Sequence, residues 1–240
     1  MKLTINSLSI FFPCYNDKGT IGKMIAESAK TAEALGIKDY EIIVTDDGST
    51  DGSRELLADL QKSDSRLKVI YHEKNRGYGA ALKSGFARAG KEWIFYTDGD
   101  AQYDVKELAL LVGALEEGVD LVNGYKMKRQ DTFDRIIIGK IYQWVMKAVF
   151  LLKIRDVDCD YRLFRKAKLD EIILKSNDGS MCVELSRRLQ NAGAVARQVP
   201  VHHFSRTYGH SQFFTFKRVS RTLLTLAKLW WELVLLGRTK

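Results

Sequence analysis

Five short runs of apolar and β-branched residues alternate with helical patterns over the first 123 residues, and this alternation constrains the fold more than any other feature. The runs are residues 8–15, 40–45, 67–72, 93–97 and 120–123. Helical spacing of apolar residues fills the gaps between them, at 20–35, 53–60, 78–89 and 105–116. Strands that alternate with helices imply right-handed crossovers. We therefore predict an α/β fold, a Rossmann-like and mostly parallel sheet flanked by helices.

Polar residues follow three of the five predicted strands at the point where each strand ends. The three segments are Pro13-Cys-Tyr-Asn, Asp46-Asp-Gly-Ser-Thr-Asp and Asp98-Gly-Asp-Ala-Gln. Ligands bind open α/β sheets outside the carboxyl ends of the strands, near the point where the strand order switches. Each segment alone is compatible with a plain turn. Three of them at strand ends predict one cleft that binds a nucleotide and a metal ion.

Asp98 and Asp100 are the central residues of the predicted metal site. They follow the strand at 93–97 directly, and both can turn toward one ion if the chain bends at Gly99. Mg²⁺ and Mn²⁺ take oxygen ligands, typically one or two carboxylates together with substrate phosphates. Gln102 adds a neutral oxygen at the same spacing. We therefore predict Mg²⁺ or Mn²⁺ bound by these three side chains.

The chain beyond residue 124 changes character. Residues 133–154 and 213–236 are apolar runs interrupted by lysine and arginine, a pattern typical of amphipathic helices on an anionic membrane surface. Packing on the domain or across a homo-oligomer interface is the alternative. Between the two runs, 156–166 alternates like a strand, 183–191 is helical and 195–201 is again a strand. We divide the chain into a main domain at 1–212 and a basic amphipathic C-terminal helix at 213–240.

The formal net charge of +8 predicts an anionic partner. No nucleic-acid-binding motif is recognisable, so we expect a membrane surface and no nucleic acid. Three cysteines without metal-ligand spacing suit reduced thiols. The first nine residues lack a signal-peptide pattern, and no segment is long and uncharged enough for a membrane span. The expected location is the cytoplasm, peripheral on the inner face of the membrane.

Six motifs, in order, resemble family 2 glycosyltransferases and, within that family, the dolichol- or polyprenyl-phosphate sugar transferases. The motifs are Pro13-x-Tyr15-Asn16, Asp46-Asp47-Gly48-Ser49-x-Asp51, Asn75-x-Gly77, Asp98-x-Asp100-x-Gln102, Cys159-x-Tyr161-Arg162-Leu163-Phe164 and Arg206-x-x-Gly209-x-Ser211. The resemblance implies a GT-A fold, a nucleotide-sugar donor, a divalent metal ion and inversion at the anomeric carbon. It makes residues 1–212 the glycosyltransferase domain.

The resemblance also implies roles for individual residues. Pro13, Tyr15 and Asp47 would line the base and ribose pocket. Arg206 would act as a catalytic cation on the diphosphate. The metal on the donor diphosphate would be held by Asp98, Asp100 and Gln102, and the remaining substrate-binding positions are Asn16, Gly77, Arg162 and Ser211. The sequence departs from the family where Tyr103-Asp104 follows Gln102, and in lacking the usual pair of large C-terminal transmembrane helices.

The acceptor decides whether a general base is needed. A sugar hydroxyl requires one, whereas a phosphate monoester is already mostly ionised at neutral pH. Asp160 is the candidate for a base or an acceptor-orienting group, and an ion pair with Arg162 or Arg165 is the alternative. Lys126 and Arg135 lie near enough in sequence to meet a lipid phosphate.

Three functional hypotheses follow. The first is an inverting, metal-dependent transfer of sugar from UDP- or GDP-sugar to polyprenyl or dolichyl phosphate. The second keeps the donor and replaces the acceptor with a sugar hydroxyl of a surface glycan. The third is a basic module that binds membrane or nucleic acid without catalysis. No Gly-x-Gly-x-x-Gly follows the first predicted strand, which argues against a dinucleotide-dependent oxidoreductase.

Overall fold

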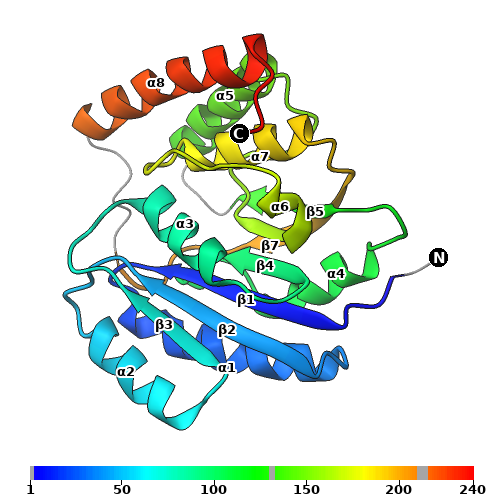
Figure 1. Ribbon diagram of the computed structural model, residues 1–240. Helices are drawn as coiled ribbons and strands as arrows, with labels where there is room; N and C mark the ends of the chain where they lie inside the picture. Colours follow the sequence, from blue (N-terminus) through cyan, green and yellow to red (C-terminus); the bar gives the residue numbers. More distant parts are fainter. Residues whose placement is uncertain (1–2, 130–132, 210–215) are drawn as a thin grey trace.

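The computed structural model describes residues 3–129, 133–209 and 216–240 (Figure 1). Within these ranges, the side chains of residues 128–129, 133–136, 138 and 216–221 are left aside.

Seven strands form one sheet in the order β3-β2-β1-β4-β6-β5-β7. Their bounds are β1 Ser7–Cys14, β2 Asp39–Asp46, β3 Leu67–Tyr71, β4 Trp93–Thr97, β5 Leu121–Arg129, β6 Tyr161–Arg165 and β7 Ala196–His203. All neighbouring pairs are parallel except those made by β6, which runs antiparallel to β4 and β5. The prediction of a mostly parallel sheet flanked by helices is confirmed.

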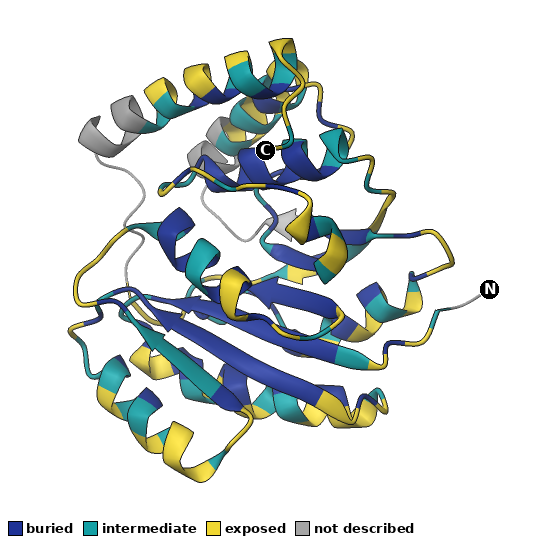
Figure 2. Cartoon of the chain, viewed as in Figure 1, coloured by how far each residue is buried: buried dark blue, intermediate teal, exposed yellow. Residues whose placement is uncertain are grey.

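Helices cover both faces of this sheet (Figure 1). Their bounds are α1 Lys18–Ala34, α2 Ser53–Ser63, α3 Tyr78–Arg88, the 3₁₀ helix η1 Val105–Glu107, α4 Leu108–Gly113, α5 Phe133–Val149, α6 Lys166–Asp170, α7 Met181–Asn191, α8 Phe216–Trp230 and the π-helix η2 Trp231–Leu235. One apolar core lies between the sheet and α1, and a second lies between the sheet, α3 and α7. Because the central strands are buried on both faces, they are continuously apolar and do not alternate with polar residues (Figure 2).

A third apolar core lies outside α7 and joins it to α5, α8 and η2. Its buried members are Met146, Phe150, Leu152, Ile154, Val157, Val183, Leu226, Leu229 and Leu233. The indole nitrogen of Trp230 on α8 donates to the carbonyl of Val149 at the end of α5, at 3.0 Å. One face of α8 therefore packs on the rest of the protein. The division at residue 212 stays a prediction.

Two predicted elements differ from the structure. The alternating stretch at 156–166 forms a strand only from Tyr161 onward, because side chains bind the backbone before it. Asp156 accepts from the backbone nitrogens of Lys126 and Asp158, at 3.2 Å each, and Arg162 donates to two carbonyls of this segment. The predicted helix at 105–116 divides into η1 and the short α4. In the part of the chain that the structure describes, no helix is long and apolar enough to cross a membrane.

Candidate functional site

The ends of β1 and β4 meet at the predicted edge of the sheet. The backbone nitrogen of Gly99 donates to the carbonyl of Pro13 at 3.2 Å, and the hydroxyl of Thr20 donates to the carbonyl of Gly99 at 2.8 Å. A Cβ atom on Gly99 would lie 2.9 Å from the Pro13 carbonyl oxygen. A residue without a side chain is therefore required where the two strand ends approach. Pro13 itself is buried at this junction.

Asn16 joins the loop after β1 to the loop after β2. Its backbone adopts a positive φ of 58°, which asparagine tolerates better than most residues. Its backbone nitrogen donates to the Ser49 hydroxyl at 2.9 Å, and its side-chain oxygen accepts from the backbone nitrogen of Thr50 at 2.8 Å. The structure therefore gives Asn16 a role in shaping the loops. The prediction that it binds substrate stays untested.

Asp47 holds the segment before α3 against the same edge. One carboxylate oxygen contacts His72 Nδ1 at 2.6 Å and accepts from the backbone nitrogen of Arg76 at 2.9 Å. The other accepts from the backbone nitrogen of Gly77 at 2.9 Å. Gly77 has a φ of 98°, and a Cβ there would lie 2.3 Å from the carbonyl oxygen of Asn177. Both residues lie at the predicted edge, where Asp47 positions the segment that contains Gly77.

Asp98, Asp100 and Asp160 lie close enough to perturb one another's protonation. Burial is the main cause that raises the pKa of Asp98 well above its usual range, and the charges of Asp160 and Asp100 raise it further. Burial also raises the pKa of Asp100. A buried group of acids like this is typical of a site that binds a cation. The two predicted metal ligands therefore lie together, with the predicted base beside them.

Tyrosine and cysteine side chains orient two of these acids. The hydroxyl of Tyr78 donates to Asp98 Oδ1 at 2.9 Å. The hydroxyl of Tyr96 and the thiol of Cys182 both donate to Asp160 Oδ1, at 3.0 and 3.2 Å. No printed bond reaches Asp160 Oδ2 in the described residues, so this oxygen remains available to a ligand. The predicted ion pair of Asp160 with Arg162 or Arg165 is not formed between the described side chains.

Arg206 connects the segment after β7 to the acids. Its guanidinium lies 2.5 Å from Asp100 Oδ2 and 3.8 Å from Asp17 Oδ1. Burial raises the pKa of Asp17 to about 7, and the charge of Asp100 adds to that rise. Asp17 Oδ2 accepts from the backbone nitrogen of Tyr15 at 3.1 Å. The arginine thus places one positive charge where two buried acids need it.

The segment 204–209 lies over this edge of the sheet. The backbones of Phe204 and Gln102 are joined by a hydrogen bond of 2.8 Å, and the side-chain nitrogen of Gln102 donates to the Phe204 carbonyl at 3.0 Å. A Cβ on Gly19 would lie 2.4 Å from the ring of Tyr208, so this ring rests on the start of α1. The amide nitrogen of Gln102 is thus used within the protein. Its role as a metal ligand stays a prediction for its side-chain oxygen.

Arg162 has a different role from the predicted one. It is fully buried, and its guanidinium donates to the carbonyls of Cys159 and Val157 and to the Ser186 hydroxyl, at 3.0, 2.6 and 2.8 Å. A guanidinium bonded in this way inside the protein does not reach a substrate. The structure points to a brace for the loop that presents Asp160.

The residues predicted to meet a lipid phosphate are only partly described. The ammonium group of Lys126 donates to the carbonyl of Asp158 at 2.7 Å, two residues before Asp160. Arg135 belongs to α5, but its side chain lies outside the described part, as does the whole of Ser211. Lys126 therefore lies beside the loop of the predicted base, which keeps it a candidate for acceptor binding.

Asp17, Tyr78, Tyr96 and Cys182 are site residues that the sequence did not reveal. Asp17 follows the first motif directly, so its position could have raised suspicion. Cys182 contacts a residue 22 positions away, and Tyr96 lies inside a strand. Without the fold, nothing in the sequence connects either residue with Asp160.

The donor set fits Mg²⁺ or Mn²⁺. Asp98 keeps one carboxylate oxygen, Oδ2, outside the printed hydrogen bonds, and Asp100 Oδ2 already faces a cation in Arg206. Over the described ranges, no group of three or more His, Cys, Asp and Glu side chains is arranged to hold a metal. A site of two carboxylates leaves coordination positions for phosphate and water, as Mg²⁺ sites on substrate phosphates usually do.

Solved structures define the fold class. Glucosyl-3-phosphoglycerate synthase from Mycobacterium tuberculosis, in complex with Mn²⁺, UDP and phosphoglyceric acid, superposes with a TM-score of 0.71 at 17% identity. The match covers 94% of this chain and 78% of that one. The UDP complex of the same synthase gives a TM-score of 0.70 at 18% identity. The fold is GT-A, as the sequence predicted.

Sequence comparison then gives the family. The model of glycosyl transferase family 2 matches residues 9–173. The undecaprenyl-phosphate 4-deoxy-4-formamido-L-arabinose transferases of Salmonella paratyphi B and Salmonella newport are 30% identical over 224 residues, which cover 92% of this chain and 67% of theirs. The chain belongs to glycosyl transferase family 2 and is a glycosyltransferase. A non-enzymatic basic module is thereby set aside.

Proposed function

We propose that the protein transfers a sugar, with inversion, from a UDP- or GDP-sugar to a polyprenyl phosphate in a reaction that depends on Mg²⁺ or Mn²⁺. The observation that carries the proposal is the meeting of Asp98, Asp100 and Asp160 beside Arg206 at the carboxyl end of β4. The named relatives act on undecaprenyl phosphate, and the synthase of similar fold was solved with Mn²⁺ and UDP.

The donor diphosphate would lie between the loops after β1, β2 and β4. Asp98 and Asp100 would hold the metal ion, which supplies positive charge to the departing diphosphate. Arg206, now paired with Asp100, would turn its planar guanidinium to the phosphate oxygens. Pro13, Tyr15 and Asp47 would border the nucleoside. In this view Arg206 neutralises the acids until the donor arrives, so the protein avoids a group of buried, unpaired charges.

Asp160 would serve the acceptor through its Oδ2 atom. Tyr96 and Cys182 hold Oδ1, so the carboxylate has a single orientation before substrate binds, and preorganisation of this kind lowers the barrier to reaction. A phosphate acceptor is largely ionised at neutral pH and would need orientation more than proton removal. Lys126, bonded to the loop of Asp160, would stand near the acceptor phosphate. The enzyme would work at the cytoplasmic face of a membrane, peripherally bound, where such an acceptor resides.

The test is direct. Purified protein is incubated with Mn²⁺, a set of labelled UDP- and GDP-sugars and a polyprenyl phosphate, and lipid-linked product is extracted and counted. We expect product from one donor, and none when EDTA replaces Mn²⁺. Absence of lipid-linked product with every common donor, in a preparation that binds UDP or GDP, would contradict the proposal.

A sugar hydroxyl of a surface glycan is the second candidate acceptor, favoured by the firm orientation of Asp160. Removing a proton from a hydroxyl requires a base, and general-base catalysis contributes about 10²–10⁴-fold. Asp160→Asn should therefore nearly abolish transfer to a hydroxyl, whereas the loss with a phosphate acceptor should be smaller. Comparing the two acceptors with this one variant separates the candidates.

A further inference from the structure

We propose that the exposed sides of α5, α8 and η2 form one docking surface for an anionic lipid bilayer. The biological purpose of this docking rests on the proposed polyprenyl phosphate acceptor, but the binding itself does not require catalysis. We call this face the outer surface and define it by its exposed apolar and basic residues. They are Ile137, Lys140, Ile141 and Trp144 on α5, and Leu223, Leu224, Lys228, Trp231, Leu236 and Arg238 on α8, η2 and the chain end.

The apolar residues of the outer surface form helical stripes that no described residue covers. Ile137, Ile141 and Trp144 follow i, i+4, i+7 spacing on one side of α5, and the Trp144 side chain is 72% exposed. On α8 and η2, Leu224 and Trp231 are 68% and 61% exposed. Exposed apolar patches of this kind mark interaction sites, whereas scattered single residues need no explanation.

The opposite sides of these helices are already used. Leu226, Leu229 and Leu233 are buried in the third apolar core, and they lie across the helix from Leu224 and Trp231. Figure 1 shows α5 and α8 on the side of α7 that faces away from the sheet, and Figure 2 shows exposed positions along α8. The two helices therefore present their apolar stripes outward while their inner sides hold them in place.

The outer surface carries positive charge without matching negative charge. Lys140, Lys228 and Arg238 make no ion pair among the described side chains. The nearby acid, Glu232, is taken by Lys175 and Arg188, at 2.6 and 2.7 Å. Unpaired cations beside exposed tryptophans match the bilayer boundary, where anionic headgroups meet the acyl chains.

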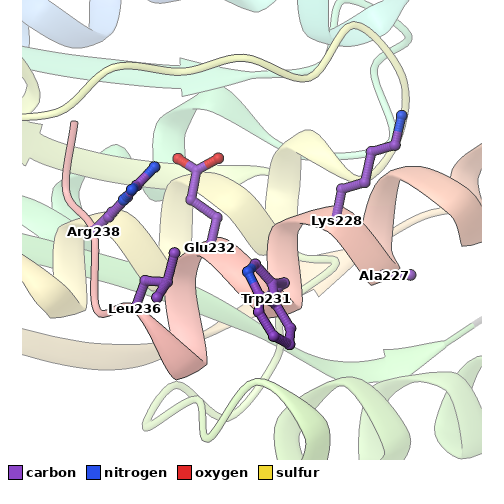
Figure 3. Close-up of a pocket in the computed structure, with 6 residues that line it drawn as sticks. All are labelled: Ala227, Lys228, Trp231, Glu232, Leu236 and Arg238. Atoms are coloured by element: carbon purple, nitrogen blue, oxygen red, sulfur yellow. The ribbon is translucent and has the colours of Figure 1, made fainter.

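A hollow of about 570 Å³ opens on the outer surface, at the junction of α8, η2 and the chain end. Its lining residues are Ala227, Lys228, Trp231, Glu232, Leu236 and Arg238 (Figure 3). Lys228 and Arg238 lie on either side of Glu232 in this view, and the Glu232 carboxylate is already neutralised by its two partners. The hollow offers an indole, an aliphatic side chain and two cations, which suits one anionic headgroup of the bilayer.

Charge and topology favour a bilayer over a second copy of the chain. In a two-fold dimer through this face, like charges from two proteins of net charge +8 would oppose one another. The start of α5 follows β5 after three residues, so α5 begins near the carboxyl-end edge of the sheet. A bilayer on the outer surface would thus lie beside the edge that contains Asp98 and Asp160, as an acceptor embedded in lipid requires.

Vesicle binding tests the proposal without any need for activity. The full-length protein is floated with vesicles of phosphatidylcholine alone or with phosphatidylglycerol at one part in four, at low and high salt. We expect binding to the anionic vesicles that weakens as salt rises. The double variant Trp144→Ala/Trp231→Ala and the double charge reversal Lys140→Glu/Lys228→Glu should each weaken binding by about tenfold or more.

Matched controls separate docking from folding and from catalysis. Leu110→Ala and Lys62→Glu change exposed residues on other helices and should bind vesicles as the parent does. Asp98→Asn should also bind normally, so loss of transferase activity and loss of docking are distinguishable. The tryptophan variant should keep its activity toward a short, water-soluble isoprenyl phosphate. Equal vesicle binding by all variants, no binding by the parent at low salt, or a dimer in solution that Trp144→Ala dissociates would overturn the proposal.

Discussion

The carboxyl-end edge of the sheet and the outer layer of α5 and α8 are stabilised in opposite ways. At the edge, side chains bind the backbone of neighbouring loops, as Asp47 does with Gly77 and Asn16 with Thr50. In the outer layer, the third apolar core does the work and few polar bonds join the helices. Hydrogen bonds demand defined distances and angles, whereas apolar contacts are not directional. The edge is therefore built for geometry, and the outer layer for adaptable contact.

The largest expected effect is on the metal-binding acids. Asp98→Asn or Asp100→Asn removes one of the two carboxylates that would hold the ion, and we expect transferase activity to fall by about 10³-fold, as when other electrostatic catalytic groups are lost. Asp59→Asn, an exposed aspartate on α2, is the matched control and should keep full activity. An active Asp98→Asn/Asp100→Asn double variant would contradict the site.

The next effect concerns the orientation of Asp160. Cys182→Ala and Tyr96→Phe each remove one donor to Asp160 Oδ1, and we expect kcat to fall by about tenfold, the cost of one misplaced hydrogen-bonding group. The KM for the donor should stay constant. Cys182→Ser keeps a donor and should recover much of the rate. A fall in thermal stability with unchanged kcat would show that these residues serve the core instead.

Arg162 should contribute to stability. Arg162→Met leaves two carbonyls and the Ser186 hydroxyl without their partner, so we expect the free energy of unfolding to drop by about 3 kcal/mol. Urea unfolding measures it. Arg197→Met is the control, because its ion pair with Glu116 is more than half exposed and should contribute less than about 1 kcal/mol. Equal losses in the two variants would refute the brace.

The smallest effect is a pH dependence from Asp17. Its pKa is about 7 in the folded protein, against 3.8 for an unperturbed aspartate. The folded state therefore keeps its proton over a range where the unfolded state has lost it, and stability falls as pH rises from about 4 to 7. In EDTA, Asp17→Asn should gain about 2 kcal/mol at pH 8 and nothing at pH 4. A gain independent of pH would contradict this assignment.

Local composition was sufficient to predict the elements of the first half of the chain. The strand at 93–97 is bounded as predicted, because an apolar, β-branched and aromatic run stands between charged or polar residues. The residues at 156–160 alternate in the same way, yet their backbone is held by Asp156 and Arg162. Bonds between side chain and backbone leave no trace in a periodicity, so the strand was predicted five residues too early.

The candidate site could be predicted as far as its motifs follow strands. Asp98 and Asp100 lie at the end of β4, where topology alone brings them to the binding edge. Arg162 shows the limit, because a basic residue is expected to be exposed and this one is buried. Cys182 and Tyr96 reach Asp160 only through the packing of α7 against the sheet. Such contacts depend on the whole fold and not on any one segment.

The central claim is that Asp98 and Asp100 together bind the cation that holds the donor diphosphate. Anomalous scattering from Mn²⁺ in crystals grown with UDP measures this directly. We predict one strong peak within coordination distance of both carboxylates, with Arg206 moved from Asp100 to the phosphate oxygens. A UDP molecule bound at this edge with no manganese peak beside the two aspartates, or a peak elsewhere, would contradict the account.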